Sequence, residues 1–369
     1  MGEVFEMTVV EEMTVDRVDL GERSYRILVG KGISMQLGEM VEELLPDVTR
    51  CAVVTSPSVD QLYGDAVLES LRCVSPVKIL VPEAEEAKTW NQAGKLLGAL
   101  VNQGFDRRSL VVALGGGSIG DLAGFVASIY LRGVRVAQVP TTLLAQVDSG
   151  IGGKTSVNHP QGKNLIGAFH QPSLVVCDPM FLLSLPSREL RSGLSEVVKY
   201  GVIADGELFK ILETHGEELV ETDQSILTDV VKRCVAIKSR LVEQDERDST
   251  GARAALNYGH TIGHAIETMS GHSVRHGEAV AVGMVAASRI AIELGLLSEL
   301  DLDRQVNVLD GLGIEATLPS LDTFEVLAVM RRDKKAEAGQ IRFVLPTGIG
   351  VPPHVRAVDD TVIIKALEA

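Results

Sequence analysis

Aromatic side chains, cysteines and excess positive charge are all scarce in this chain of 369 residues. Aromatic residues make up 4% of it, so its core must be built mainly from Val, Leu, Ile and Ala. Hydrophobic residues still make up 45% and charged residues 23%, an ordinary globular composition that argues against disorder. A chain of this length is expected to form two domains.

The four cysteines lie far apart, at positions 51, 73, 177 and 234, and none belongs to a CxxC pair. This spacing predicts buried, reduced thiols and argues against a disulfide frame or a zinc knuckle. The N-terminal stretch has no basic segment followed by an apolar run, so no signal peptide is predicted. We therefore expect a cytoplasmic protein.

Positive charge is outnumbered, with 35 Lys and Arg against 50 Asp and Glu, which gives a net charge of −15. Surfaces that bind nucleic acid or anionic membranes need basic patches, so neither partner is expected. No apolar stretch approaches the roughly 18 residues that a membrane span requires. A small anionic substrate remains compatible with the composition, because a local lysine cluster can outweigh a diffuse negative field.

Between about residues 24 and 185 the pattern alternates between short apolar runs and amphipathic segments. The predicted strands are rich in β-branched residues and lie at 25–30, 51–56, 77–82, 109–117, 134–140 and 173–178. Apolar strands separated by helices predict a parallel sheet covered on both faces. After residue 186 helical periodicity dominates, with one late strand in 340–350. We predict a Rossmann-like α/β domain at residues 1–185 and a mostly α-helical domain at residues 186–369.

Glycines mark the point where the strand at 109–117 passes into a helix. In GGGSIGD, residues 115–121, glycine allows a phosphate to approach the backbone, and the helix N-terminus offers free N–H groups. The spacing differs from the GxGxxG fingerprint, and a tight strand-to-helix connection would show similar glycines. Asp121 at the helix start and the PTT segment at 140–142 favour dinucleotide binding.

A glycine-rich polar loop is predicted at residues 148–172. It combines four positions suited to an oxygen-rich anion, Lys154, Asn158, Lys163 and Asn164, with few acids. Lysine and asparagine supply charge and hydrogen bonds to phosphate or carboxylate. A solvated surface loop is the plainer alternative.

A histidine cluster lies in ALNYGHTIGHAIETMSGHSVRHGEAV, residues 255–280. His260 and His264 share one helix face, and His276 precedes the next helical run. Catalytic zinc takes three protein ligands from imidazole and carboxylate groups and keeps an open position. The spacing alone pairs His260 with His264, but no glutamate stands between them as in HExxH, and either histidine would also serve in a substrate pocket.

Glu196 is the candidate carboxylate ligand. It lies in SGLSEVVKYG among apolar neighbours, where a carboxylate is costly unless it is paired or bound to metal. Lys199 lies one helical turn further on. The separation of 64 positions between Glu196 and His260 imposes no geometric constraint.

At these motifs the chain resembles the 3-dehydroquinate synthase family of the sugar phosphate cyclase superfamily. The resemblance covers nearly all of the chain from residue 25 to residue 350. It is carried by GGGSIGDLAGFVAS, RGVRVAQVPTTLLAQVDSGIGGKTSVNHPQGKNLIGAF, SGLSEVVKYG, LNYGHTIGHAIE, HGEAVAVGM and RRDKKAEAGQIRFVLP. It implies the dehydroquinate synthase-like fold, a homodimer, and NAD and Zn²⁺ as cofactors, with Co²⁺ as an alternative metal.

The resemblance also assigns individual residues. Zinc would be bound by Glu196, His260 and His276, so that His264 would contact the substrate. The residues that would hold the substrate's phosphate and carboxylate are Lys154, Asn164, Lys199, Lys238, Arg253, Asn257, Lys335 and, in the family from the partner subunit, Arg132. The NAD site would comprise Glu85, Lys88, Gly116, Gly117, Ser118, Ile119, Gly120, Asp121, Thr141, Thr142, Asp148, Lys154, Lys163, Phe181 and Ser184.

Three features depart from the family pattern. Ser56 stands where the family usually carries Asp or Asn for the adenosine ribose, the segment between Lys238 and Arg253 is one residue longer, and the first 15 or so residues have no counterpart.

The reaction that the resemblance implies converts 3-deoxy-D-arabino-heptulosonate 7-phosphate into 3-dehydroquinate and phosphate, a step of the shikimate pathway towards aromatic amino acids. It proceeds by transient oxidation with NAD, phosphate elimination, re-reduction and an intramolecular aldol reaction. A sister cyclase of the 2-deoxy-scyllo-inosose or 2-epi-5-epi-valiolone synthase type would share the metal and NAD residues. A glycerol dehydrogenase-like oxidoreductase is a further alternative.

Overall fold

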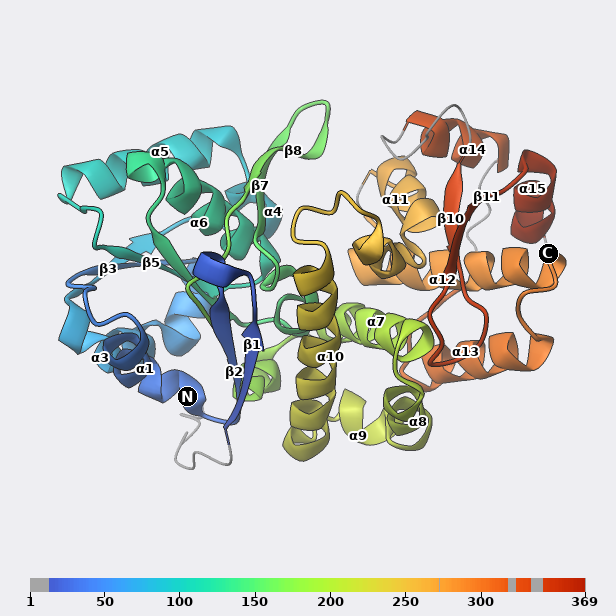
Figure 1. The fold of residues 1–369 in the computed structure, drawn as a ribbon, viewed down its shortest axis with the longest axis horizontal. Helices are drawn as coiled ribbons and strands as arrows, with labels where there is room; N and C mark the ends of the chain where they lie inside the picture. Colours follow the sequence, from blue (N-terminus) through green and yellow to red (C-terminus); the bar gives the residue numbers. More distant parts are fainter. Residues whose placement is uncertain (1–12, 272, 318–322, 333–340, 369) are drawn as a thin grey trace. The chain divides into compact units, whose positions relative to one another are not determined.

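The computed structural model describes residues 13–271, 273–317, 323–332 and 341–368, and these form two compact units (Figure 1). The first contains the described residues up to Leu185 together with Leu227–Arg247. The second contains Pro186–Ile226 and the described residues from Asp248 onwards. The predicted division at residues 185 and 186 differs from these units in the segment Leu227–Arg247, because helical periodicity does not reveal which core a helix joins.

A seven-stranded sheet forms the centre of the first unit, in the order β1-β2-β9-β6-β5-β3-β4. Its strands are β1 (Thr14–Val18), β2 (Tyr25–Val29), β3 (Cys51–Thr55), β4 (Pro76–Leu80), β5 (Leu110–Gly115), β6 (Arg135–Pro140) and β9 (Leu174–Cys177). The strands from β2 to β4 in this order pair in parallel, while β1 pairs antiparallel with β2 at the edge. The six strands predicted from apolar runs are thus confirmed as a parallel sheet.

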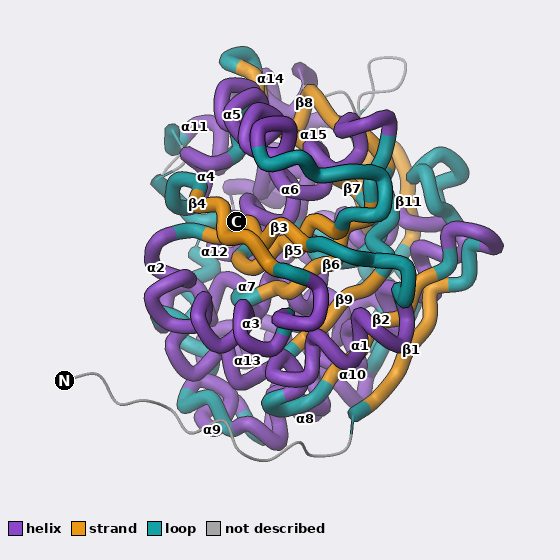
Figure 2. Tube along the Cα trace, turned by 90° about the vertical axis from the view of Figure 1, so that its left-hand side faces the viewer, coloured by secondary structure: helices purple, strands orange, loops and turns teal. Residues whose placement is uncertain are grey.

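Helices cover both faces of this sheet (Figure 2). Val111 and Ala113 of β5 pack towards α5 (Trp90–Asn102) and α6 (Gly117–Ile129). The alternate residues Leu110 and Val112 belong to the other core, with α1 (Leu37–Leu44) and α3 (Asp65–Ser70). Both sides of the strand are therefore buried, which explains its unbroken apolar sequence. The remaining helices of this region are α2 (Pro57–Val59), α4 (Ala84–Ala87) and α10 (Gln224–Gln244), of which α10 starts in the second unit.

A β-hairpin occupies most of the segment that was predicted to be a polar loop. Strands β7 (Lys154–His159) and β8 (Gly162–Phe169) pair antiparallel, so the loop prediction is wrong for these residues. The glycines, lysines and asparagines that suggest an anion site also hide the alternation that marks a strand. Thr155, Ser156 and Val157 are all buried, so β7 is covered on both faces at these positions.

The second unit is mostly helical, as predicted. Its helices are α7 (Ser187–Ile203), α8 (Gly206–Thr214), α9 (Gly216–Val220), α11 (His260–Met269), α12 (His276–Glu293), α13 (Glu299–Gly311), α14 (Thr323–Arg332) and α15 (Asp360–Glu368). Helix α12 is central and packs against α7, α11, α13 and α15. The predicted late strand is β10 (Arg342–Leu345). Its partner β11 (His354–Ala357) has the same length but no buried residue, so it lacks the apolar run that marks β10.

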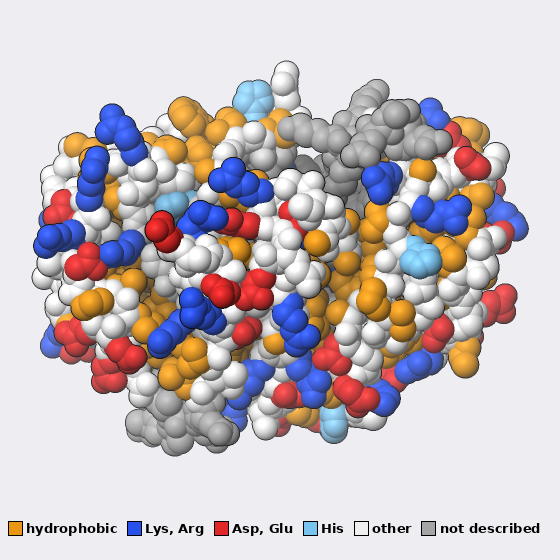
Figure 3. Space-filling model, viewed as in Figure 1, with side chains coloured by type: hydrophobic (Ala, Val, Ile, Leu, Met, Phe, Trp, Pro, Cys, Tyr) orange, Lys and Arg blue, Asp and Glu red, His pale blue; other side chains and the backbone are white. Residues whose placement is uncertain are grey.

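The cysteine prediction holds for three of the four thiols. Cys51, Cys177 and Cys234 are buried, but Cys73 is exposed in the turn Arg72–Val74, so its predicted burial is wrong. Burial raises the pKa of Cys51 to about 12, which keeps that thiol protonated. Within the described residues, no helix combines the length and apolar character that crossing a membrane requires. Lys and Arg side chains alternate with Asp and Glu on the face drawn in Figure 3.

Candidate metal and cofactor sites

Three side chains from three helices converge within the second unit: Glu196 of α7, His260 of α11 and His276 of α12. The Oε1 atom of Glu196 lies 3.5 Å from Nε2 of His260 and 3.3 Å from Nε2 of His276. Two ligand atoms that each lie about 2.1 Å from a tetrahedral zinc ion are about 3.4 Å apart. All three atoms lie within 4.8 Å of one another, so both the donor types and their spacing fit a divalent metal such as zinc.

Each member of this triad has a second partner that fixes its orientation. Nδ1 of His260 donates to the carbonyl of Tyr258 at 3.0 Å, and Nδ1 of His276 donates to the Glu267 carboxylate at 3.1 Å. These bonds leave both Nε2 atoms directed at Glu196. Lys199 contacts the other carboxylate oxygen of Glu196, Oε2, one helical turn along α7.

The pKa values of the two histidines shift in opposite directions. Burial lowers the pKa of His260 well below its usual value, and the Lys199 charge adds to this effect although Glu196 opposes it. Burial would also lower the pKa of His276, but hydrogen bonds to Glu196 and Glu267 outweigh it and raise that pKa to about 10. His260 is therefore neutral, as a metal ligand must be, and a metal ion on His276 would displace its proton.

Glycines bring the backbones of these helices close together. A Cβ atom on Gly277 would lie 2.1 Å from the carbonyl oxygen of Ser192 on α7, and one on Gly283 would lie 1.9 Å from that of Gly259. Gly277 also donates its N–H to the Ser192 hydroxyl at 3.1 Å. Because Gly277 follows His276 and Gly259 precedes His260, these approaches set the spacing of the triad.

His264 lies beside the triad. Its ring centroid is 5.4 Å from that of His260 and 6.2 Å from that of His276. It joins Glu267 and His276 in a second group of ligand-type atoms, which shares His276 with the Glu196 group. The pairing of His260 with His264 that their spacing suggests is thus replaced by a group in which His276 takes the place of His264.

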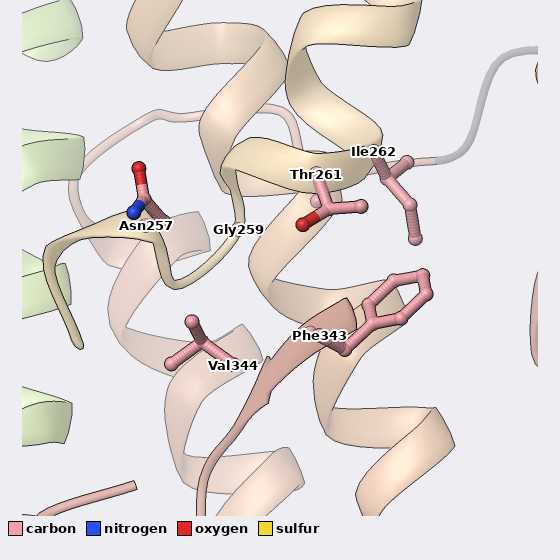
Figure 4. Close-up of a pocket in the computed structure, with 8 residues that line it drawn as sticks. Asn257, Gly259, Thr261, Ile262, Phe343 and Val344 are labelled. Carbon is pink, nitrogen blue, oxygen red and sulfur yellow. The ribbon is translucent and has the colours of Figure 1, made fainter. Parts of the chain in front are cut away.

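Two other predicted residues of this unit, Arg253 and Asn257, lie just before α11. Arg253 is 1% exposed and Asn257 ends the same helical turn, Ala252–Asn257. Asn257 lines a small pocket, with Phe343 at its opposite end (Figure 4). The pocket is otherwise lined by Gly259, Thr261, Ile262, Gly283, Ala287 and Val344. Lys335 lies outside the described residues.

The glycine turn of the first unit lies where β5 and β6 end side by side. Gly116 is the N-cap of α6, and among the described residues no side chain caps this helix. A Cβ atom would lie 3.1 Å from Thr142 at Gly116 and 2.7 Å from the Ser149 hydroxyl at Gly117. Glycine thus keeps the helix N-terminus open at the carboxyl ends of parallel strands, an arrangement that fits a dinucleotide.

Charged and polar side chains gather around this turn. Glu85 accepts hydrogen bonds from Ser118 at 2.8 Å and from Asn158 at 2.6 Å, and Lys88 pairs with Asp121. Burial would raise the pKa of Glu85, but Asn158, Lys88 and Ser118 together hold it below its usual value. Burial raises the pKa of Asp121 against the opposing charge of Lys88. The structure therefore brings Glu85, Lys88, Ser118 and Asp121 together.

The remaining predicted residues of the first unit differ in their surroundings: some have polar partners, some pack in the cores, and some are exposed. Asp148 pairs with Lys238 of α10, the Asn164 side chain accepts a hydrogen bond from Ser156 at 3.0 Å, and Thr141 follows β6. Ile119 and Phe181 face the two cores, and Ser184 bonds to Tyr63. A Cβ atom at Gly120 would lie 2.7 Å from the side-chain oxygen of Gln138. Arg132, Lys154 and Lys163 are at least partly exposed.

Comparisons with known proteins identify the family. Models of the 3-dehydroquinate synthase N-terminal and C-terminal regions match residues 78–192 and 193–336. A 3-dehydroquinate synthase of Thermodesulfovibrio yellowstonii is 48% identical over 90% of this chain and 94% of its own. The chain belongs to the 3-dehydroquinate synthase family.

Solved structures of other cyclases share the fold of this family member. The 2-epi-5-epi-valiolone synthase of Streptomyces hygroscopicus, with NAD⁺ and Zn²⁺ bound, has a TM-score of 0.85 and 30% identity, covering 95% of this chain and 97% of its own. A 2-deoxy-scyllo-inosose synthase complexed with carbaglucose-6-phosphate, NAD⁺ and Co²⁺ has a TM-score of 0.85 and 26% identity, covering 96% and 99%.

Sequence reasoning missed Glu267 and Tyr258, which accept hydrogen bonds from the triad histidines in this 3-dehydroquinate synthase family member. Glu267 could have been predicted from its spacing. It follows His264 by three residues and His260 by seven, and so shares their helix face. Tyr258 acts through its backbone carbonyl, which no residue type reveals.

Proposed function

We infer that this chain converts 3-deoxy-D-arabino-heptulosonate 7-phosphate into 3-dehydroquinate and phosphate with NAD and a divalent metal. The observation that carries the inference is the triad of Glu196, His260 and His276, whose spacing fits a zinc ion, in a chain of this family. The open glycine turn at Gly116 and Gly117 supports the NAD site.

The two cofactors supply the chemistry that side chains lack: NAD takes up and returns a hydride, and the metal polarises a substrate oxygen. The chain's residues hold and orient these groups. Glu196, His260 and His276 would bind the metal, and Lys199 would keep one oxygen of Glu196 engaged. Gly116, Gly117 and the α6 N-terminus would receive the NAD phosphates, with Lys88 and Asp121 beside them.

The substrate would be held by the cationic and amide side chains named from the resemblance. Lys199 and Arg253 are each 1% exposed, and Lys238 is 6% exposed. Lys199 contacts Glu196 and Lys238 pairs with Asp148. Hydrogen bonds from cationic side chains to phosphate and carboxylate oxygens are strong, so cations at these positions support a substrate that carries such groups. This favours the heptulosonate over the substrates of sister cyclases, which we keep as the alternative.

Phosphate release without net NADH formation tests the function. Purified protein with Zn²⁺, catalytic NAD and the heptulosonate phosphate should release phosphate over many turnovers while NADH absorbance stays constant. Steady accumulation of NADH would instead indicate a dehydrogenase. Phosphate release from another sugar phosphate, but not from the heptulosonate, would favour a sister cyclase.

Replacing Lys154 should weaken substrate use without affecting the metal. Lys154 is exposed at the start of β7, and its ammonium group would bind a substrate oxygen. The loss of a charge-assisted hydrogen bond costs about 1.5–3 kcal/mol, so kcat/KM of Lys154→Ala should fall about 10- to 100-fold. Lys95→Ala, at an exposed lysine of α5, is the matched control and should change neither kcat/KM nor zinc content. Zinc loss in Lys154→Ala would contradict the assignment.

We also propose that the protein is a cytoplasmic homodimer. Its three buried thiols suit a reducing compartment. Arg132 is exposed in the turn Tyr130–Arg132, a position compatible with the family pattern in which this arginine reaches the partner's substrate.

A further inference from the structure

His276 stands between two carboxylates on different helices. Its Nε2 atom lies 3.3 Å from Oε1 of Glu196 on α7, and its Nδ1 atom lies 3.1 Å from Oε2 of Glu267 on α11. The two ring nitrogens of one imidazole thus face two acids. Each acid belongs to a different group of ligand-type atoms, Glu196 with His260 and His276, and Glu267 with His264 and His276.

Only one of these groups suits a metal at a time. A neutral imidazole has one nitrogen with a lone pair and one with a proton, so it offers a single ligand atom. The Glu196 group includes His260, whose Nδ1 proton is already given to the Tyr258 carbonyl and whose Nε2 therefore carries the lone pair. In the Glu196 group both histidines present Nε2, provided that the proton of His276 resides on Nδ1.

We propose that Glu267 is a positioning residue: its carboxylate accepts the Nδ1–H of His276 and thereby presents Nε2 to the metal beside Glu196. The inference rests on the proposed metal site. Glu267 is suited to this role because its side chain is 10% exposed and its helix packs directly on α12. Buried carboxylates that accept from ligand histidines fix the ring and strengthen it as a ligand.

The two histidines are oriented by different means. His260 uses the carbonyl of Tyr258, whose fully buried phenol donates to Gln305 at 2.6 Å, so this acceptor is fixed by the backbone. His276 begins α12, and its acceptor is a side chain on another helix. The orientation of His276 therefore depends on a side chain that can be mutated. Replacing Glu267 removes the acceptor of the His276 Nδ1–H but leaves all three proposed metal ligands in place.

The test measures Zn²⁺ affinity by competition with a chromophoric chelator and the visible absorption of Co²⁺-loaded protein. Glu267→Ala should bind Zn²⁺ about 10- to 100-fold more weakly and should alter the Co²⁺ spectrum. Glu267→Gln should lose less, because its amide oxygen still accepts the Nδ1–H. Thr268→Ala, at the exposed next residue of α11, should match the unmodified protein.

Unchanged Zn²⁺ affinity in folded Glu267→Ala would overturn the proposal, as would an equal loss in Thr268→Ala. If Glu267→Ala does not fold, Glu267→Gln decides alone: a several-fold loss of affinity supports the role, and unchanged affinity overturns it. An unmodified protein that binds no Zn²⁺ would overturn the metal site itself and this inference with it.

Discussion

A His276→Ala variant should lose both its metal and its turnover while keeping its fold. The change removes one of three ligand atoms and leaves Glu196 and His260 with an incomplete site. A metal supplies several kcal/mol of charge stabilisation, and each ~1.4 kcal/mol is tenfold in rate, so kcat should fall at least about 1000-fold. Zinc content after purification and phosphate release from the heptulosonate phosphate measure the two losses.

The fold should survive because other contacts hold the start of α12. The Arg275 N–H donates to Glu278 at 2.9 Å, and Arg188 donates to the same carboxylate at 2.6 Å. His354→Ala, at an exposed histidine of β11 in the same unit, is the matched control and should retain zinc and turnover. A His276→Ala protein with full zinc content and full activity would remove His276 from the ligand set.

The parallel sheet could be predicted because its strands are buried on both faces. In β5, Leu110 and Val112 face one core while Val111 and Ala113 face the other, so the whole run is apolar. The β7–β8 hairpin lacks this signal. Thr155, Ser156 and Val157 are buried, but Lys154 is exposed. No residue of β8 is fully buried, and Gly162, Lys163, Asn164 and Gly167 within it are residue types that are also typical of a loop.

The metal residues could be named but not assembled from the sequence. Glu196 and His260 are 64 positions apart, and only the packing of α7 and α11 against α12 brings them together. Histidine spacing favoured His264 because a helix places residues four apart on one face. The structure instead sets His276, from a neighbouring helix, beside Glu196, since α12 begins at that histidine.

A Gly283→Ala variant should destabilise the helical unit and weaken metal binding, although alanine is the better helix former. Alanine in a helix interior gains about 1 kcal/mol over glycine, while overpacking costs about 1–3 kcal/mol or more. The added Cβ would lie 1.9 Å from the Gly259 carbonyl oxygen and 2.9 Å from the Gly263 nitrogen. These are backbone atoms that cannot rotate away, so the clash should prevail and lower the Tm by several degrees.

Metal affinity should fall as well, because the backbone that is pushed away leads directly into His260. Thermal unfolding of the metal-free protein measures the packing effect, and chelator competition measures the effect on Zn²⁺. Gly98→Ala is the matched control: it lies inside α5, and its Cβ would have nothing within 4 Å, so its Tm should rise slightly or stay unchanged. If Gly283→Ala behaved like Gly98→Ala in both measurements, the close approach of α12 to Gly259 would not be what holds His260 in the triad.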